Sequence, residues 1–163
     1  AGAHSVSLSG STISIAEKVL PLRNVPVVTP FPTGIPPEIK EAAELVRTAI
    51  ERLTSDGSAE QVALAILEAN TDSFQALNDL AEVIARGARK YLLEEKPLVI
   101  VCKKDCAKVL GQCLHFKVPQ NAQIVCIDQV EVAEGDFLDI GKPLFAGTIV
   151  PVVVKTLIFS GAA

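Results

Sequence analysis

The pattern of apolar and polar residues predicts a chain of alternating strands and helices. Three short aliphatic runs, at 61–67, 98–102 and 123–127, lack the polar alternation of half-exposed strands and are typical of buried strands. The run at 98–102 has the pattern of a parallel strand that is covered on both faces. Helical patterns lie between these runs, so the order of elements predicts an α/β layer with right-handed crossovers.

Two long segments carry the apolar stripe of an amphipathic helix. The first runs from about Pro37 to Leu53, with a stripe that consists of Ile39, Ala42, Ala43, Val46, Ala49, Ile50 and Leu53. The second is predicted to begin with a capping box formed by Asp72 and Gln75 and to continue to about Leu93. Its inward-facing side chains are expected to be Phe74, Leu77, Leu80, Ile84 and Tyr91.

The N-terminal part of the chain is expected to be extended. Residues 1–15 alternate apolar and small polar side chains on both sides of Gly10, which predicts a half-buried hairpin. Residues 20–37 contain most of the prolines and predict an extended connector with at most a short strand at 25–28.

The C-terminal part is predicted to be rich in β structure. Gly135, Gly141 and Gly147 recur at near-regular intervals, as in tight β turns. The stretch VPVVVKTLIF at 150–159 has a strand pattern, and Pro151 predicts that this strand lies at an edge or contains a bulge.

Composition and charge limit the class of protein. At 163 residues the chain fits a single domain spanning 1–163, and 49% hydrophobic against 21% charged residues predict a packed globule. The net charge of −4 and the pI near 5.2 argue against nucleic acid as a partner. No apolar run approaches the roughly 20 residues that span a bilayer, and no signal peptide is visible, so no membrane partner is predicted.

The four cysteines lie close together in the sequence. Cys102, Cys106, Cys113 and Cys126 are expected to be buried and reduced, because no pair has the spacing of a zinc or thioredoxin-type site. Cys106 is the exception, since it would lie in the first turn of a helix directly after two lysines. That setting lowers the pKa of a thiol.

The turn KKDCAK after the strand at 98–102 is the site that chain geometry favours. Ligands of open α/β sheets bind outside the carboxyl ends of the strands, where a helix N-terminus offers N–H groups to an anion. Lys103, Lys104 and Lys108 would add positive charge beside Asp105. The alternative is that Asp105 only caps the helix at 106–116 and that the lysines are solvated.

Other candidate residues carry weaker signals. Gly2 and Ala3 read as a small-residue turn that lets a ligand approach the backbone. His4 and His115 are too few for a catalytic assignment, and His115 is expected to be an interior group. An acidic cluster is expected to alternate between faces and to be mostly solvated, with Mg²⁺ binding as the minority interpretation; it comprises Asp128, Glu131, Glu134, Asp136 and Asp139. No phosphate-binding loop or nucleophile-elbow motif is present in the sequence.

Two stretches carry a specific family resemblance: VCIDQVEVAEGDFLDIGKPLFAGTIVPVVVKTLIF at 125–159 and KPLVIVCKKDCAKVLGQ at 96–112. Together with the opening GAHSVSLSGSTISI and with LPLRNVPVV at 20–28, they resemble the C-terminal part of the ethanolamine utilization proteins that reactivate ethanolamine ammonia-lyase. The chain begins AGAHS, with no initiator Met, so we expect it to be a fragment of a longer protein.

The resemblance implies a fold, an activity and a nucleotide. The fold would be a ribonuclease-H-like lobe of the actin and Hsp70 superfamily, with a mixed sheet, flanking helices and a β-rich C-terminal tail; two such lobes close on ATP and Mg²⁺. The whole protein would be a chaperone-like factor in the cytoplasm, or at a bacterial microcompartment, that uses ATP to release damaged cobalamin from ethanolamine ammonia-lyase. Gly2, Ala3, His4 and Ser5 would then lie on the nucleotide side of the cleft.

Some features depart from that superfamily. The first-lobe phosphate loops and the acidic residues for Mg²⁺ are missing, so we expect no ATP hydrolysis by this chain alone. The opening turn is Gly-Ala rather than Gly-Gly, and a Ser-rich hairpin pattern follows where a helix is usual. Two other classes stay open: a lobe of a small-molecule kinase, with a carboxylate base in a polar pocket, and a pure interaction module, with an exposed apolar patch. The oligomeric state stays open as well.

Overall fold

The computed structural model describes residues 2–9, 19–67, 72–144 and 150–157. Within them the strands are β1 (Gly2–Ser9), β2 (Leu22–Val28), β3 (Val62–Ile66), β4 (Leu98–Cys102), β5 (Ile124–Asp128), β6 (Phe137–Ile140) and β7 (Val150–Leu157). The helices are α1 (Ile39–Thr54), α2 (Phe74–Gly87), α3 (Arg89–Leu93) and α4 (Ala107–His115). None of the helices among these residues is long and apolar enough to cross a membrane.

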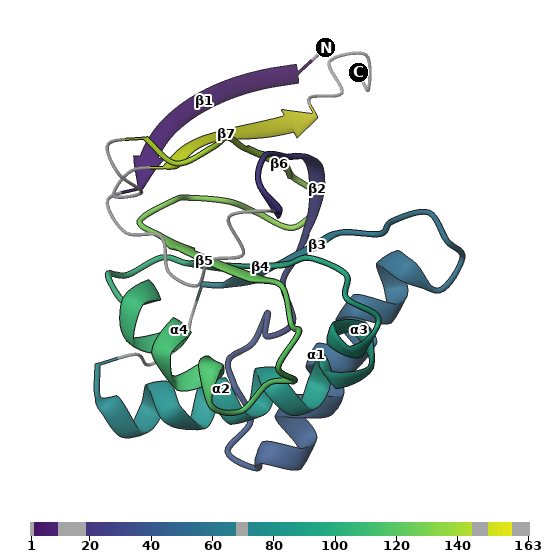
Figure 1. Cartoon of the computed structure of the whole chain (residues 1–163), viewed down its shortest axis with the longest axis vertical. Coiled ribbons are helices and arrows are strands. Elements are labelled where there is room, and N and C mark those ends of the chain that lie inside the picture. Colours follow the sequence, from purple (N-terminus) through teal and green to yellow (C-terminus); the bar gives the residue numbers. More distant parts are fainter. Residues whose placement is uncertain (1, 10–18, 68–71, 145–149, 158–163) are drawn as a thin grey trace.

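The strands form one mixed sheet in the order β1-β7-β6-β2-β3-β4-β5. The pairs β2/β3, β3/β4 and β4/β5 are parallel, whereas β1/β7, β7/β6 and β6/β2 are antiparallel. Figure 1 shows the helices on one side of the parallel strands and β1 and β7 on the other. The predicted α/β class with a mixed sheet and a β-rich C-terminal part is therefore confirmed.

Both faces of the parallel strands are covered, and this explains their aliphatic sequences. Along β3, Val62, Leu64 and Ile66 pack into the core that lies between the sheet and the helices. Ala63 and Ala65 point to the opposite face and pack into a second core. That second core is completed by β6, β7 and the segment after β5, through Val130, Val132, Leu138, Ile140, Val150, Val152 and Val154. The antiparallel strands thus curl over the face that the helices leave free.

The proline-rich segment 20–37 contains a strand longer than predicted. β2 covers seven residues and lies between β6 and β3, inside the sheet. The backbone N–H and C=O of Val27 bond to the β6 side, to Asp136 and Gly135, so the nitrogen of Pro26 points toward β3. Pairing with β3 begins only at Val27, so Pro26 removes no donor that the described ladder uses.

Pro151 also lies inside the sheet, although its sequence predicted an edge strand or a bulge. β7 pairs with β1 on one side and with β6 on the other. The Pro151 carbonyl accepts a hydrogen bond from the N–H of Gly141, one residue beyond the end of β6. Its nitrogen faces this same side, where the β6 ladder has already ended, so the strand tolerates proline there.

The helical predictions are largely confirmed. In α1 the predicted stripe is buried at Ala42, Ala43, Val46, Ala49 and Ile50. The cap of α2 is Ser73 rather than Asp72, because the Ser73 hydroxyl accepts a hydrogen bond from the N–H of Ala76 at 3.1 Å. Phe74 is 68% exposed, not inward-facing, since it is the first residue of α2 and precedes the buried stripe. Ala88 separates α2 from α3, so the predicted single helix is two.

The described part of the N-terminal region is a strand, and the predicted hairpin stays a prediction because its second half is not described. β1 pairs antiparallel with β7 along its whole length. Residues 10–18, which would form the second half of the predicted hairpin, lie outside the described residues, as does Gly147. Gly135 has a φ of +89°, which fits the predicted tight turn before β6.

Candidate functional site

The carboxyl ends of β4 and β5 meet the start of α4, where the sequence predicted a ligand site. Asp128 ends β5 and is fully buried. Its Oδ2 accepts a hydrogen bond from the backbone N–H of Ala107, the first residue of α4, at 3.0 Å. The cap of α4 is therefore supplied from 21 residues away, and the prediction that Asp105 caps this helix is wrong. Asp105 is exposed in the turn.

This cap changes the electrostatics of the predicted anion site. A carboxylate at the start of α4 uses one of the N–H groups that an anion would need and adds negative charge there. Lys103, Lys104 and Lys108 are exposed, and the Nζ of Lys104 lies 3.3 Å from an Asp72 carboxylate oxygen. A ligand site at Lys103 and Asp105 stays a prediction, with fewer helix donors than the sequence suggested.

Three of the four cysteines gather at this end of the sheet. All four are buried and reduced, as predicted. The Cys102 thiol hydrogen-bonds that of Cys106, and this bond together with burial raises the pKa of Cys102. Burial also raises the pKa of Cys126, and the charges of Cys106 and Asp128 add to that increase. The predicted thiolate character of Cys106 stays a prediction.

The residues predicted for the nucleotide side lie in β1. Gly2, Ala3, His4 and Ser5 pair in order with Leu157, Thr156, Lys155 and Val154 of β7. The predicted small-residue turn is therefore wrong, because the backbone of Gly2 and Ala3 is an extended strand. In the sheet, β7, β6, β2 and β3 lie between β1 and β4, so strand pairing does not bring these residues beside Lys103 and Asp105.

The remaining polar candidates divide between surface and core. His115 is exposed at the end of α4, against the prediction, because the buried stripe of that helix uses Ala107, Leu110, Gly111, Cys113 and Leu114. Asp128 and Asp136 of the acidic cluster are buried rather than solvated. Asp136 accepts hydrogen bonds from the N–H of Ala133 and from the hydroxyl of Thr156. In the described part of the chain, no group of three acidic, histidine or cysteine side chains could hold a metal ion.

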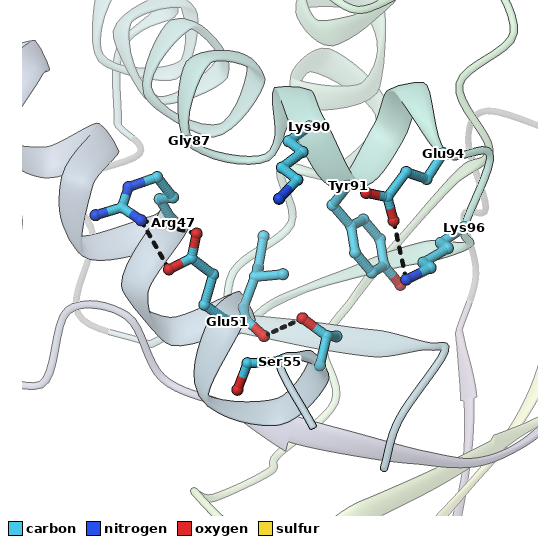
Figure 2. Close-up of a pocket in the computed structure, with 10 residues that line it drawn as sticks. Arg47, Glu51, Ser55, Gly87, Lys90, Tyr91, Glu94 and Lys96 are labelled. Atoms are coloured by element: carbon cyan, nitrogen blue, oxygen red, sulfur yellow. Dashed lines mark hydrogen bonds and ion pairs between the residues drawn. The ribbon is translucent and has the colours of Figure 1, made fainter. Parts of the chain in front are cut away.

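A cavity of about 330 Å³ lies between the end of α1 and α3, and no sequence motif predicted it. Figure 2 shows the Lys90 side chain pointing into the space between Glu51 and Tyr91, with Tyr91 on the side of Glu94 and Lys96. The ionic groups of its walls are largely paired: Arg47 contacts Glu51 at 2.7 Å and Lys96 contacts Glu94 at 2.9 Å. The Tyr91 hydroxyl donates to the carbonyl of Pro97, and burial raises the pKa of this phenol. Three cationic side chains, Arg47, Lys90 and Lys96, lie in this lining with two carboxylates, so its ionic groups carry one net positive charge.

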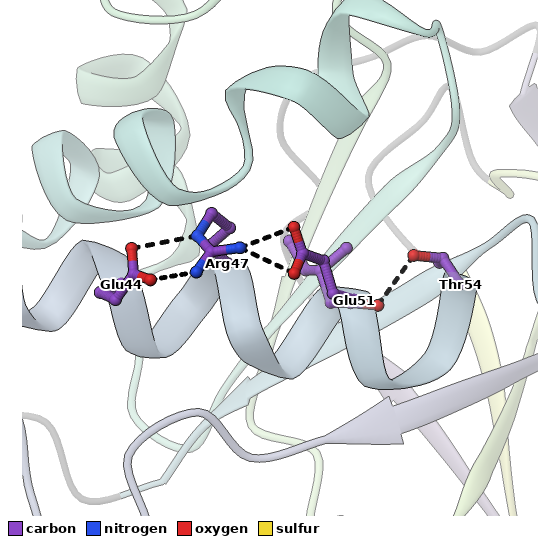
Figure 3. Close-up of polar contacts among 5 residues, drawn as sticks. Glu44, Arg47, Glu51 and Thr54 are labelled. Atoms are coloured by element: carbon purple, nitrogen blue, oxygen red, sulfur yellow. Dashed lines mark hydrogen bonds and ion pairs between the residues drawn. The ribbon is translucent and has the colours of Figure 1, made fainter. Parts of the chain in front are cut away.

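Arg47 belongs both to this cavity and to an ion-pair ladder along α1. Its guanidinium bonds Glu44 and Glu51, one turn before and one turn after it (Figure 3). These residues lie at i, i+3 and i+4 spacing on the exposed face of the helix. The ladder engages Arg47 on both sides and leaves it little freedom to bind a ligand.

Comparison with known proteins identifies the family. The family model described as ethanolamine utilisation protein EutA matches residues 1–160. The chain belongs to the EutA family. The match includes β1, the β4–α4 turn and both cores, and the resemblance predicted from the sequence is confirmed.

Two curated relatives in the EutA family are both named ethanolamine ammonia-lyase reactivase EutA. The protein of Salmonella typhimurium is 37% identical over 159 residues, and that of Escherichia coli K12 is 36% identical over 166 residues. Each match covers 98% of this chain and 32% of the relative, so the chain spans about a third of the length of these EutA proteins. No solved structure matches the chain significantly.

Proposed function

We propose that this chain forms part of a reactivating factor for ethanolamine ammonia-lyase in ethanolamine utilisation. The observation that carries the proposal is the EutA family match over residues 1–160, together with two relatives that are named reactivases of this lyase. Since the chain spans about a third of these relatives, the activity belongs to the whole protein, and this region contributes one part of it.

The proposed mechanism follows the two-lobed ATPases that the sequence resembles. In this mechanism the chain is a ribonuclease-H-like lobe, and closure of two lobes on ATP with Mg²⁺ loosens the lyase so that damaged cobalamin leaves and intact adenosylcobalamin enters. The protein acts as a chaperone in the cytoplasm or at a bacterial microcompartment. A mixed sheet with all described helices beside its parallel strands is compatible with such a lobe.

The nucleotide part of the proposal assigns Gly2, Ala3, His4 and Ser5 to the adenosine side. Their position at one edge of the sheet leaves one side of the β1 backbone without a described partner strand. Calorimetric titration of the chain with Mg-ATP and with adenosine tests this part. Binding that is lost in Gly2→Val but kept in Gly141→Ala, a variant after β6 where an added Cβ makes only ordinary contacts, would support it. Absence of binding at millimolar nucleotide in wild type would contradict it.

The two alternative classes have less support. A small-molecule kinase lobe needs a carboxylate base that faces a polar pocket, and both glutamates in the cavity between α1 and α3 are held by Arg47 or Lys96. An interaction module needs a contiguous apolar patch. The exposed large apolar side chains of the described residues come from five different segments and include no more than one from each helix; they are Leu45, Phe74, Leu93, Phe116 and Leu144.

Direct binding to the lyase tests the partner that we propose. Ethanolamine ammonia-lyase with damaged cobalamin is immobilised, the chain is passed over it, and binding is measured by surface plasmon resonance. A second cobalamin enzyme of unrelated sequence is the control surface. Saturable binding to the lyase alone would support the proposal. Equal binding to both surfaces, or to neither, would show that this region does not bind the lyase specifically and would contradict the proposal.

A further inference from the structure

The thiols at the start of α4 form a second feature with chemistry of its own, independent of the proposed function. Cys102 is the last residue of β4, and Cys106 directly precedes α4. Both side chains pack into the core between the sheet and the helices, and they hydrogen-bond each other. We propose that Cys102 and Cys106 are an oxidation site, at which a peroxide joins them into an intramolecular disulfide.

The backbone between the two residues supports this pairing. Cys106 donates its N–H to the carbonyl of Lys104 at 2.8 Å, so the chain turns back toward the end of β4. Disulfides need Cα atoms roughly 4.4–6.8 Å apart, a separation that suits thiols already in hydrogen-bond contact across a tight turn. The turn residues Lys103, Lys104 and Asp105 are exposed, which allows them to adjust when the bond forms.

The exposure of the two thiols indicates which of them reacts first with the peroxide and which then forms the disulfide. Cys106 is 5% exposed and lies next to the exposed turn, whereas Cys102 is 1% exposed and Cys126 is fully buried. Hydrogen peroxide therefore reaches Cys106 first, upon local opening of the turn. The sulfur of Cys106 attacks one peroxide oxygen, the O–O bond breaks, and sulfenic acid and water form. The Cys102 sulfur then attacks the Cys106 sulfur, which releases a second water and leaves the disulfide.

Two other cysteines provide internal comparisons. Cys126 lies on β5, where it pairs in register with Ile100, two residues before Cys102, and its pKa responds to the charge of Cys106. It is the competing partner for Cys106. Cys113 lies two turns along α4 and is the control thiol, because it is buried in the same core without a described bond to the other three.

Tryptic peptide mapping can distinguish all possible disulfide pairings of the four cysteines. Trypsin cleaves after Lys103, Lys104, Lys108 and Lys117, so each of the four cysteines falls in a different peptide. The folded chain is treated with hydrogen peroxide, remaining thiols are alkylated, and the tryptic peptides are analysed by mass spectrometry without reduction. The proposal predicts a cross-linked pair that joins the Cys102 peptide to DCAK, the peptide of Cys106, with loss of two hydrogen atoms.

Variants and a denatured control make the outcome decisive. The cross-link should vanish in Cys102→Ser and in Cys106→Ser and persist in Cys113→Ser, with folding of each variant checked by circular dichroism. Chain oxidised in concentrated urea should give a mixture of pairings. The proposal is overturned if the folded chain joins Cys106 to Cys126, gives the same mixture as the denatured chain, or shows no cross-link after oxidation.

Discussion

The carboxylate of Asp128 caps α4 by accepting a hydrogen bond from the N–H of Ala107, at 3.0 Å. The two residues are far apart in the sequence, and the cap joins the edge strand β5 to the helix that precedes it. Because Asp128 is fully buried, loss of its carboxylate leaves a helix N–H without this acceptor.

Asp128→Ala is predicted to lower the free energy of unfolding by about 1–3 kcal/mol, the usual cost of an unsatisfied buried group. Urea denaturation followed by circular dichroism measures the change. Asp105→Ala is the matched control, because Asp105 is the exposed acidic residue next to the same helix. Its effect should stay within about 0.5 kcal/mol. A larger loss for Asp105→Ala than for Asp128→Ala would contradict the capping assignment.

Gly87 is predicted to be required for the contact between α1 and α2. A Cβ at this position would lie 2.5 Å from the Ala43 carbonyl oxygen and 2.6 Å from the Val46 Cβ, so the helices would have to separate. Gly87→Ala should therefore cost about 1–3 kcal/mol of stability despite the higher helix propensity of alanine. Thermal unfolding measures the loss.

The control for this variant is Gly141→Ala. There the nearest atom to an added Cβ is the Pro151 Cγ at 3.4 Å, which is an ordinary contact. A change below about 0.5 kcal/mol is expected. Equal destabilisation by the two variants would contradict the prediction, because the close approach of α1 to α2 exists only at Gly87.

How much of this structure the sequence predicts depends on whether the signal is local. The strands β3, β4 and β5 and the stripe of α1 are predicted correctly, because each is encoded within one short segment. β2 is longer than predicted, since its pairing comes from β6, more than 100 residues later. Pro26 within β2 also made the local sequence typical of a connector and not of a paired strand.

The candidate site shows the same limit. The sequence places a turn and a helix start correctly at Lys103 to Cys106, but it names Asp105 as the cap because Asp105 is the nearest acidic residue. Only the parallel pairing of Cys102 with Asp128 brings the real cap into place. The cavity between α1 and α3 depends on how two helices pack, and no local motif reports it.

Asp139 is predicted to make stability depend on pH in the acidic range. Partial burial opposes its ionisation, but hydrogen bonds from Lys155 and from the N–H of Asn24 outweigh that effect and lower its pKa below the ordinary 3.8. The stabilisation is therefore complete above the unfolded-state pKa and is lost as pH falls through the lower folded-state pKa.

Urea denaturation of wild type and Asp139→Asn at a series of pH values measures this contribution. The difference in free energy of unfolding between the two should be constant near neutral pH and shrink as the pH drops below 3.8. Asp105→Asn, at an exposed position, is the control. A difference for Asp139→Asn that does not change with pH would contradict the lowered pKa of Asp139 and its stabilisation by Lys155 and the Asn24 N–H.

The ladder of Glu44, Arg47 and Glu51 is predicted to stabilise α1 in a salt-dependent way (Figure 3). Arg47→Ala should lower stability slightly at low ionic strength, and the loss should disappear near 1 M salt, where the screening length falls to about 3 Å. Arg86→Ala, which removes an arginine that pairs with Glu82 alone among the described residues, should have a smaller effect. A loss for Arg47→Ala that persists in high salt would point to packing of its side chain against the cavity instead.

The most direct test of the central proposal is recovery of lyase activity. Ethanolamine ammonia-lyase that carries damaged cobalamin is incubated with adenosylcobalamin, Mg-ATP and the full-length protein that contains this chain, and ammonia release from ethanolamine is followed. We predict that activity returns only when the protein and hydrolysable ATP are both present. If activity returns no faster than with adenosylcobalamin alone, the assignment of this chain to a lyase reactivase is wrong.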